Sequence, residues 1–232
     1  MQRTIAENLA GVRGRIAEAA RRAGRQADEV TLVAVTKYVG AEAARALVSL
    51  GCQDLGESRP QTLWPKAESL RGSPVRWHMI GHLQRNKVKR TLPLVDCIHS
   101  ADSVRLLDTL EEEARNLDRA IRVLLEVNVS GDVEKHGFAR DEVFALAPRL
   151  ADWPHVEIRG LMAMSGRWSG PEAARSEFAR LRHLRDAMRA NGPAHIDLGC
   201  LSMGMSDDFE LAVEEGATLV RIGSALFEGV PE

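Results

Sequence analysis

Short apolar runs alternate with amphipathic segments along almost the whole chain. Short continuous runs of this kind, rich in Val, Ile and Leu, are typical of strands that are buried on both faces of a parallel sheet. They predict eight strands, at residues 31–37, 52–56, 76–81, 94–99, 121–129, 158–164, 195–199 and 219–222. The segments between them predict helices, at residues 41–50, 60–70, 104–116, 141–150 and, as a long amphipathic helix, 171–190. A basic helix is expected at 85–90, and a last helix, which Ser206 or Asp207 caps, ends near residue 215.

One further helix precedes the first strand. Its apolar residues recur at helical spacing, as Ile5, Leu9, Val12 and Ile16. Gly24 is a typical helix end. We therefore expect residues 1–24 to form an extra helix, which covers the bottom of the fold.

The strict alternation of strand and helix predicts a parallel sheet with right-handed crossovers. Eight such units in 232 residues favour a single (β/α)8 TIM barrel over an open doubly wound sheet. A Rossmann-like sheet is the alternative, but no GxGxxG follows the first predicted strand. No boundary, repeat or low-complexity tract divides the chain, so we expect one domain over residues 1–232.

Composition limits the partners and the cellular compartment that we expect for the protein. The formal net charge of -2 gives no reason to expect nucleic acid or an acidic membrane as the main partner. The three cysteines, Cys52, Cys97 and Cys200, are far apart, which argues against a disulfide scaffold or a zinc site and favours a reducing cytoplasm. The charged N-terminus does not have the pattern of a signal peptide, and no apolar run is long enough to span a bilayer.

In a TIM barrel the carboxyl ends of the strands meet at one mouth, where the chemistry takes place. The residue types expected there are one amine, one guanidinium, several hydroxyls and glycines, and few carboxylates. This set favours the binding of an anionic aldehyde over metal-assisted hydrolysis. The residues are Lys37, Glu57, Ser58, His82, Gln84, Asn128, Met164, Ser202, Met203, Arg221, Gly223 and Ser224.

Lys37 ends the first predicted strand, where its side chain is expected to project into a cavity. A desolvated lysine amine is partly neutral and can attack an aldehyde to form a Schiff base. The alternative is a solvated lysine at the boundary between strand and loop.

The last two strand–helix units predict a phosphate site. Gly223 and Ser224 directly follow the eighth strand and open a short helix, and Ser202 with Gly204 follows the seventh. Phosphate-binding barrels use these two loops, because free backbone N–H groups at a helix start attract an anion. The alternative is that Gly223 and Ser224 only turn the chain and cap a helix.

Arg221 shares a strand face with Gly223, and an arginine inside a barrel needs a partner. That partner is either a carboxylate, such as Glu57 or Asp197, or the ring nitrogen of a ligand. The pyridine nitrogen of pyridoxal 5'-phosphate (PLP) is met by Asp or by Arg in its enzymes. With arginine the nitrogen stays unprotonated, which makes the ring a weaker electron sink.

Several blocks of sequence, in order along the chain, resemble one known family. They are VAVTK at 33–37, GE at 56–57, WHMIGHLQ at 77–84 with NK at 86–87, IHS at 98–100, VN at 127–128, GLM at 160–162, LSMGMSDD at 201–208 and RIGSALF at 221–227. With these blocks the chain resembles the PLP homeostasis proteins, which are similar to the N-terminal domain of alanine racemase.

The resemblance implies a single TIM barrel of PLP fold type III that holds PLP as an aldimine on Lys37. It also implies that Arg221 faces the pyridine nitrogen and that Ser202, Gly223 and Ser224 hold the phosphate. The other residues expected at the cofactor are Ser58, Met164 and Met203. The chain departs from the family at Ser58-Arg59, where Asn-Tyr is usual, and at Glu228, which intervenes before Gly229.

The resemblance implies a carrier or regulator of PLP without established turnover, which could supply apo PLP-dependent enzymes. An amino-acid racemase is the alternative, but it needs an acid–base pair on opposite faces of the ligand. Tyr38 is the only tyrosine, and strand alternation would point it away from Lys37; we also expect no second domain to supply one. A cofactor-free aldolase would need Glu57 as its proton shuttle. Because the barrel needs no partner, we expect a monomer.

Overall fold

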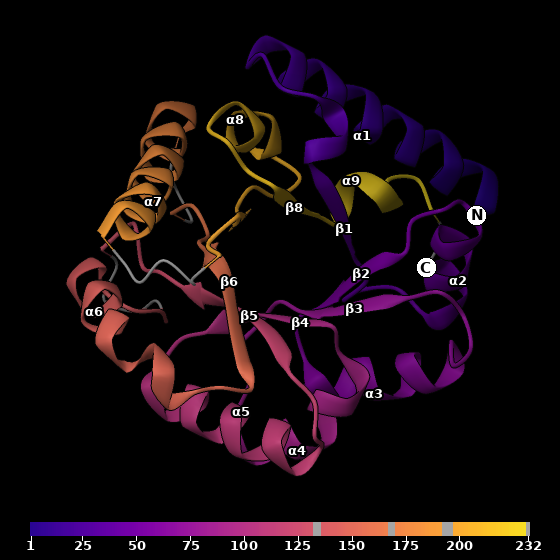
Figure 1. Ribbon diagram of the computed structural model, residues 1–232. Helices are drawn as coiled ribbons and strands as arrows, with labels where there is room; N and C mark the ends of the chain where they lie inside the picture. Colours follow the sequence, from indigo (N-terminus) through magenta and orange to yellow (C-terminus); the bar gives the residue numbers. More distant parts are fainter. Residues whose placement is uncertain (132–135, 167–169, 192–196, 231–232) are drawn as a thin grey trace.

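The structure, a computed structural model, describes residues 1–131, 136–166, 170–191 and 197–230. Eight parallel strands close into a barrel in chain order, and helices surround it (Figure 1). The expected TIM barrel is confirmed. The strands are β1 (Thr31–Val35), β2 (Asp54–Glu57), β3 (Arg76–Met79), β4 (Cys97–Ala101), β5 (Ile121–Glu126), β6 (Val156–Met162), β7 (Cys200–Ser202) and β8 (Leu219–Ile222).

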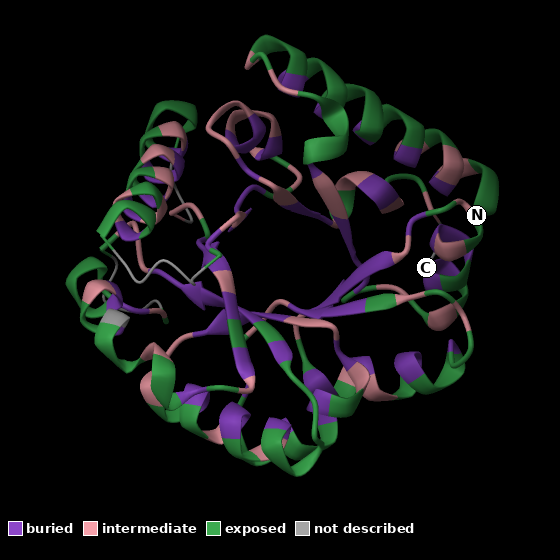
Figure 2. Cartoon of the chain, viewed as in Figure 1, coloured by how far each residue is buried: buried purple, intermediate pink, exposed green. Residues whose placement is uncertain are grey.

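The helices carry their buried residues on the side that faces the barrel and their exposed residues outward (Figure 2). Ser103 caps α5, because its hydroxyl accepts a hydrogen bond from the backbone N–H of Leu106. The α-helices are α1 (Gln2–Arg22), α2 (Ala41–Ser49), α3 (Pro60–Ser69), α4 (Arg85–Thr91), α5 (Val104–Asn116), α6 (Arg140–Ala145), α7 (Pro171–Asn191), α8 (Phe209–Glu214) and α9 (Ser224–Phe227). Short 3-10 helices lie at Ala27–Glu29, Leu92–Leu94 and Ala147–Asp152.

The N-terminal helix α1 lies in the outer helical layer, beside α8 and α9 (Figure 1). Ion pairs join Arg15 to Glu210 and Arg22 to Glu214, at 3.0 and 2.7 Å. The expected position at the bottom of the barrel is wrong, because α9 has only four residues and α1 completes the apolar cover around the junction of β8 and β1.

Two strand boundaries differ from the expected ones in ways that affect the site. The first strand ends at Val35, two residues before Lys37. The seventh strand was expected at 195–199, of which 195 and 196 lie outside the described residues, but β7 runs from Cys200 to Ser202. Ser202 is therefore a strand residue and not a loop residue. Among the described residues, no helix is both long and apolar enough to cross a membrane.

Gly160 allows β6 and β7 to approach closely. A Cβ atom at this position would lie 1.9 Å from the backbone oxygen of Cys200. We expect Gly160→Ala to lower the free energy of unfolding by about 1–3 kcal/mol, because the backbone must shift to admit the methyl group. Urea denaturation measures this change. Gly14→Ala, in open space on α1, is the control and should leave stability unchanged or raise it. Equal effects of the two substitutions would contradict the close approach.

Candidate functional site

Closure of the barrel places the first strand beside the last one. Strand β1 pairs with β8, with Val33 opposite Arg221. A Cβ atom at Gly223 would lie 3.3 Å from the backbone oxygen of Val35, so Gly223 packs against the end of β1. Lys37 follows two residues later. The amine and the glycine turn that the sequence predicted to share a site thus follow neighbouring strands.

Lys37 lies in the turn after β1 and is exposed. The turn starts at Thr36, whose carbonyl accepts a hydrogen bond from the N–H of Val39 at 3.1 Å. The expectation of a desolvated strand residue is therefore wrong in this structure. The Nζ atom of Lys37 lies 4.8 Å from the centroid of the Tyr38 ring, so the expectation that the two side chains point apart is also wrong.

A buried ion pair lies directly behind Lys37. Glu57 is fully buried at the end of β2, and its Oε1 accepts hydrogen bonds from Lys66 Nζ at 2.5 Å and Thr36 Oγ1 at 2.6 Å. The Lys66 ammonium also donates to the backbone oxygen of Thr36 at 2.6 Å. These contacts hold the residue that precedes Lys37. Lys66 was not among the predicted site residues. The available signal was a lysine in the helix that follows Gly56 and Glu57.

Arg221 lies inside the barrel and is buried. Its Nη1 donates to Ser202 Oγ at 2.5 Å and its Nη2 to the backbone oxygen of Ala163 at 2.9 Å. Burial lowers the pKa of the guanidinium to about 10, so Arg221 stays charged at neutral pH. The alternative of an ion pair with Glu57 or Asp197 is excluded. Glu57 is paired with Lys66, and Asp197 is paired with Arg159 at 3.0 Å.

Ser202 and Met203 point to different layers. The Ser202 hydroxyl is fully buried inside the barrel, 2.9 Å from His99 Nδ1. Met203 is fully buried in the hydrophobic core, because adjacent residues of a strand face opposite sides. The structure therefore gives the Met203 side chain a packing role, and it places the Ser202 hydroxyl on Arg221 and not at the turn after β8.

The hydroxyl of Ser206, from the loop after β7, contacts the turn after β8 instead. It accepts hydrogen bonds from the backbone N–H groups of Gly223 and Ala225, at 3.3 and 3.4 Å. The sequence analysis assigned Ser206 or Asp207 to the cap of the next helix, but the N-cap of α8 is Asp208. The sequence signal that could have indicated this role is the second serine of the LSMGMS block at 201–206. Ser206 is thus the hydroxyl that joins the loops after β7 and β8.

The remaining expected residues lie around the mouth. Ser224 is exposed at the start of α9, and Met164 is 39% exposed after β6. Ser58 is half-buried after β2, where its backbone oxygen would lie 2.3 Å from a Cβ atom at Gly81. The strand ends therefore bring Lys37, Ser58, Met164, Gly223 and Ser224 to one face of the barrel.

Comparison with known proteins agrees with this geometry. The alanine racemase N-terminal domain family matches residues 8–231. The PLP homeostasis protein of Pseudomonas aeruginosa is 41% identical over 97% of this chain and 95% of its own length, and that of Aquifex aeolicus is 39% identical over 95% and 96%.

Solved structures agree as well. PipY of Synechococcus elongatus, solved with PLP bound, is 33% identical, with a TM-score of 0.86 over 96% of this chain and 99% of PipY. Alanine racemase from Corynebacterium glutamicum, at 18% identity, shares the fold, with a TM-score of 0.68 over 100% of this chain and 62% of that enzyme. The chain belongs to the family of the pyridoxal phosphate homeostasis proteins, which is built on the alanine racemase N-terminal domain.

Proposed function

We propose that this protein binds PLP at the barrel mouth, covalently through Lys37, and serves PLP homeostasis in the cytoplasm. The observation that supports this function best is the closure of β1 on β8, which places the Lys37 turn beside Gly223. PipY, solved with PLP bound, and the name of the Pseudomonas aeruginosa relative both support the identity of the ligand. When bound, PLP supplies an aldehyde that a lysine amine can attack and a phosphate that backbone N–H groups can hold.

The residues of this chain fit the three parts of that ligand. Lys37 is an exposed primary amine, and Gly223 and Ser224 begin a helix after β8. Ser206 orients the backbone of the same turn. Arg221 carries a fixed positive charge inside the barrel and cannot accept a proton, which suits an unprotonated pyridine nitrogen.

Carriage fits this site better than racemisation. A racemase needs two proton-transfer groups on opposite faces of the ligand. The ring of Tyr38 lies against the amine of Lys37 itself, so the two groups share one side. We therefore propose that the protein holds PLP and supplies it to apo PLP-dependent enzymes, and that it acts as a monomer.

The test is an absorbance spectrum of the purified protein with added PLP, before and after borohydride reduction, followed by peptide mapping. We expect a visible band that borohydride removes and a modified peptide that contains Lys37, one of five lysines in the chain. A protein that stays colourless with PLP would contradict the proposal. If the protein measurably interconverted the enantiomers of alanine, racemisation would replace PLP carriage as the proposed function.

We expect Arg221→Glu to change the absorbance spectrum of bound PLP. A carboxylate at this position favours a protonated pyridine nitrogen, whereas the guanidinium disfavours it. Circular dichroism first establishes that the variant is folded. Arg159→Glu is the control, because Arg159 is a half-exposed arginine of β6 that pairs with Asp197 and has no contact with Ser202 or Ala163 among the hydrogen bonds of the described residues. An unchanged spectrum in a folded Arg221→Glu variant would remove Arg221 from the ring nitrogen.

A further inference from the structure

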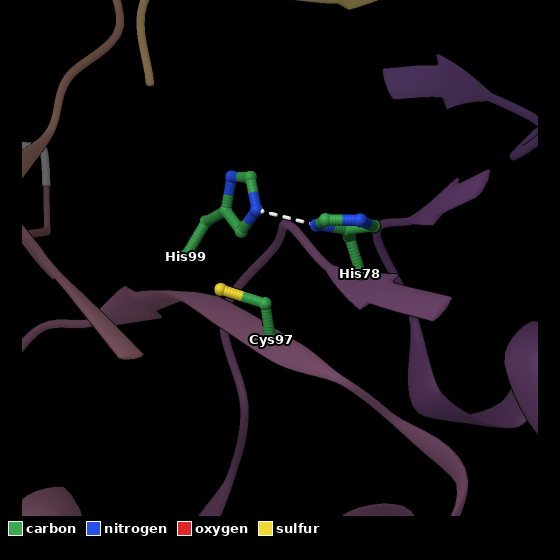
Figure 3. Close-up of side chains that lie close together, drawn as sticks. All are labelled: His78, Cys97 and His99. Atoms are coloured by element: carbon green, nitrogen blue, oxygen red, sulfur yellow. Dashed lines mark hydrogen bonds between the residues drawn. The ribbon is translucent and has the colours of Figure 1, made fainter. Parts of the chain in front are cut away.

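A chain of buried hydrogen bonds crosses the barrel interior. It starts at Arg221 Nη1, which lies 2.5 Å from Ser202 Oγ, and continues over 2.9 Å to His99 Nδ1. His99 Nε2 lies 2.9 Å from His78 Nδ1, and His78 Nε2 lies 3.0 Å from Asp54 Oδ1. Figure 3 shows the central link, with the two rings edge to face on neighbouring strands. All five residues are at least nine-tenths buried.

Arg221 and Asp54, at the two ends of this series of hydrogen bonds, can each act only as donor or only as acceptor. A guanidinium can only donate hydrogen bonds, and an ionised carboxylate can only accept them. Burial alone would raise the pKa of Asp54, but hydrogen bonds from Arg76 and His78 lower it to about 2. Arg76 Nη2 lies 2.6 Å from Asp54 Oδ2, where both residues line a cavity of about 430 Å³ at the end of the barrel opposite the mouth. Asp54 is therefore ionised at neutral pH.

We propose that Asp54, His78, His99 and Ser202 form a one-directional chain of hydrogen bonds that positions the Arg221 guanidinium for the ligand. Arg221 donates to Ser202, and the Ser202 hydroxyl donates to His99 Nδ1. His99 Nε2–H then donates to His78 Nδ1, and His78 Nε2–H donates to Asp54. Both rings are neutral and carry their proton on Nε2. The ligand named here, PLP, rests on the proposed function.

A positively charged His78 would reverse the inner half of the chain. His78 Nδ1–H would then donate to His99, and His99 Nδ1–H would donate to Ser202. Ser202 Oγ would receive two donors, and its own hydrogen would have no acceptor among the partners that the described residues give it. A second cation would also be buried beside a carboxylate that already pairs with Arg76. The neutral arrangement gives the Ser202 hydroxyl hydrogen and the ring N–H of each histidine an acceptor.

A metal ion is a weaker explanation of the same residues. Cys97 lies beside the two rings, and single ligand atoms of His78, Cys97 and His99 lie within 4.8 Å of one another (Figure 3). The facing ring nitrogens already share a hydrogen bond, and the two outer nitrogens bond Ser202 and Asp54. Burial also raises the pKa of the Cys97 thiol, which opposes the thiolate that a metal needs.

The direction of the chain determines what Ser202 can do. Its single O–H is committed to His99, so its oxygen serves as the acceptor for Arg221. Ser202 then positions the guanidinium and has no hydrogen to donate to a phosphate. That contact falls to Ser224 and to the turn that Ser206 orients. Rotation of Arg221 away from its place would break the bond to Ser202 and leave buried polar atoms unpaired, which keeps the guanidinium in one orientation.

The first test uses the ligand-free, folded protein. Histidine is labelled with ¹⁵N, and long-range ¹H–¹⁵N correlation spectra report which nitrogen of each ring carries the proton. We expect His78 and His99 to be neutral, with hydrogen on Nε2 only. The variants His78→Gln and His99→Gln assign the signals. Hydrogen on His99 Nδ1, or a positively charged His78, would overturn the one-directional chain.

The second test measures positioning through the cofactor. His99→Phe removes both bonds at the centre of the chain, and we expect the dissociation constant for PLP to rise about tenfold, the effect of roughly one weakened hydrogen bond. The spectrum of bound PLP should also shift. His99→Gln, which retains a donor and an acceptor, should restore part of both. His155→Phe is the control, because His155 also bonds a carboxylate, that of Glu111, but outside the barrel interior.

The outcomes separate this inference from the proposed function. If the unmodified protein does not bind PLP, the proposed function fails, while the nitrogen spectra still decide the direction of the chain. If His99→Phe folds and binds PLP with unchanged affinity and spectrum, the chain does not position Arg221. Should His99→Phe fail to fold, Ser202→Ala breaks the chain next to Arg221 and takes its place, with the same expected rise and the same contradicting result.

Discussion

Lys37→Ala is expected to abolish the visible absorbance band of PLP on the protein and the attachment that borohydride traps. Lys37 follows β1, whose last residue Val35 packs against Gly223, and alanine has no nucleophile to replace its amine. The measurement is an absorbance titration with PLP, followed by reduction and intact mass. Weak non-covalent binding should remain, because Arg221 and the turn after β8 are unchanged.

Two further variants sharpen this result. Lys37→Arg keeps the positive charge without a nucleophilic amine, and it should lose the band as completely as Lys37→Ala. Lys89→Ala, which removes an exposed lysine of α4, should retain the band. A band of full intensity in Lys37→Ala would show that another lysine carries the cofactor.

Lys66→Met is expected to lower the free energy of unfolding by about 3–5 kcal/mol, because it leaves the fully buried Glu57 carboxylate without its cation. It should also weaken PLP binding, since Lys66 holds the carbonyl of Thr36, the residue before Lys37. Urea denaturation measures the first effect and absorbance titration the second.

The double variant Lys66→Met with Glu57→Gln tests the reason for this loss. It removes both charges and keeps one acceptor oxygen, for Thr36, while the Thr62 hydroxyl retains the backbone oxygen of Arg59 as its acceptor, so it should recover part of the lost stability. Lys89→Met, on the surface, should change stability by less than about 0.5 kcal/mol. A loss in Lys66→Met no larger than that of the surface control would show that the buried pair contributes little.

The repeating pattern of the sequence was sufficient for the fold, because the alternation of strands and helices is local, although β7 lies at residues 200–202 and not at the expected 195–199. The bounds of α5 agree with the expected residues 104–116, since Ser103 supplies an unambiguous cap. Strand ends were less certain. The run at 31–37 gives no local sign that the chain turns at Thr36, because that turn depends on Glu57 and Lys66. An error of one or two residues at a strand end changes which face a side chain occupies.

The sequence by itself therefore determined the TIM barrel, the family, and the presence of Lys37, Arg221 and Gly223 at one end of the barrel. Only the tertiary structure decided the partners of these residues. Glu57 forms an ion pair with Lys66, Ser202 accepts a hydrogen bond from Arg221, and Ser206 accepts one from the turn after β8. The reason is that alternation along a strand specifies a face, whereas a hydrogen bond across a closed barrel depends on register and depth, to which distant strands contribute together.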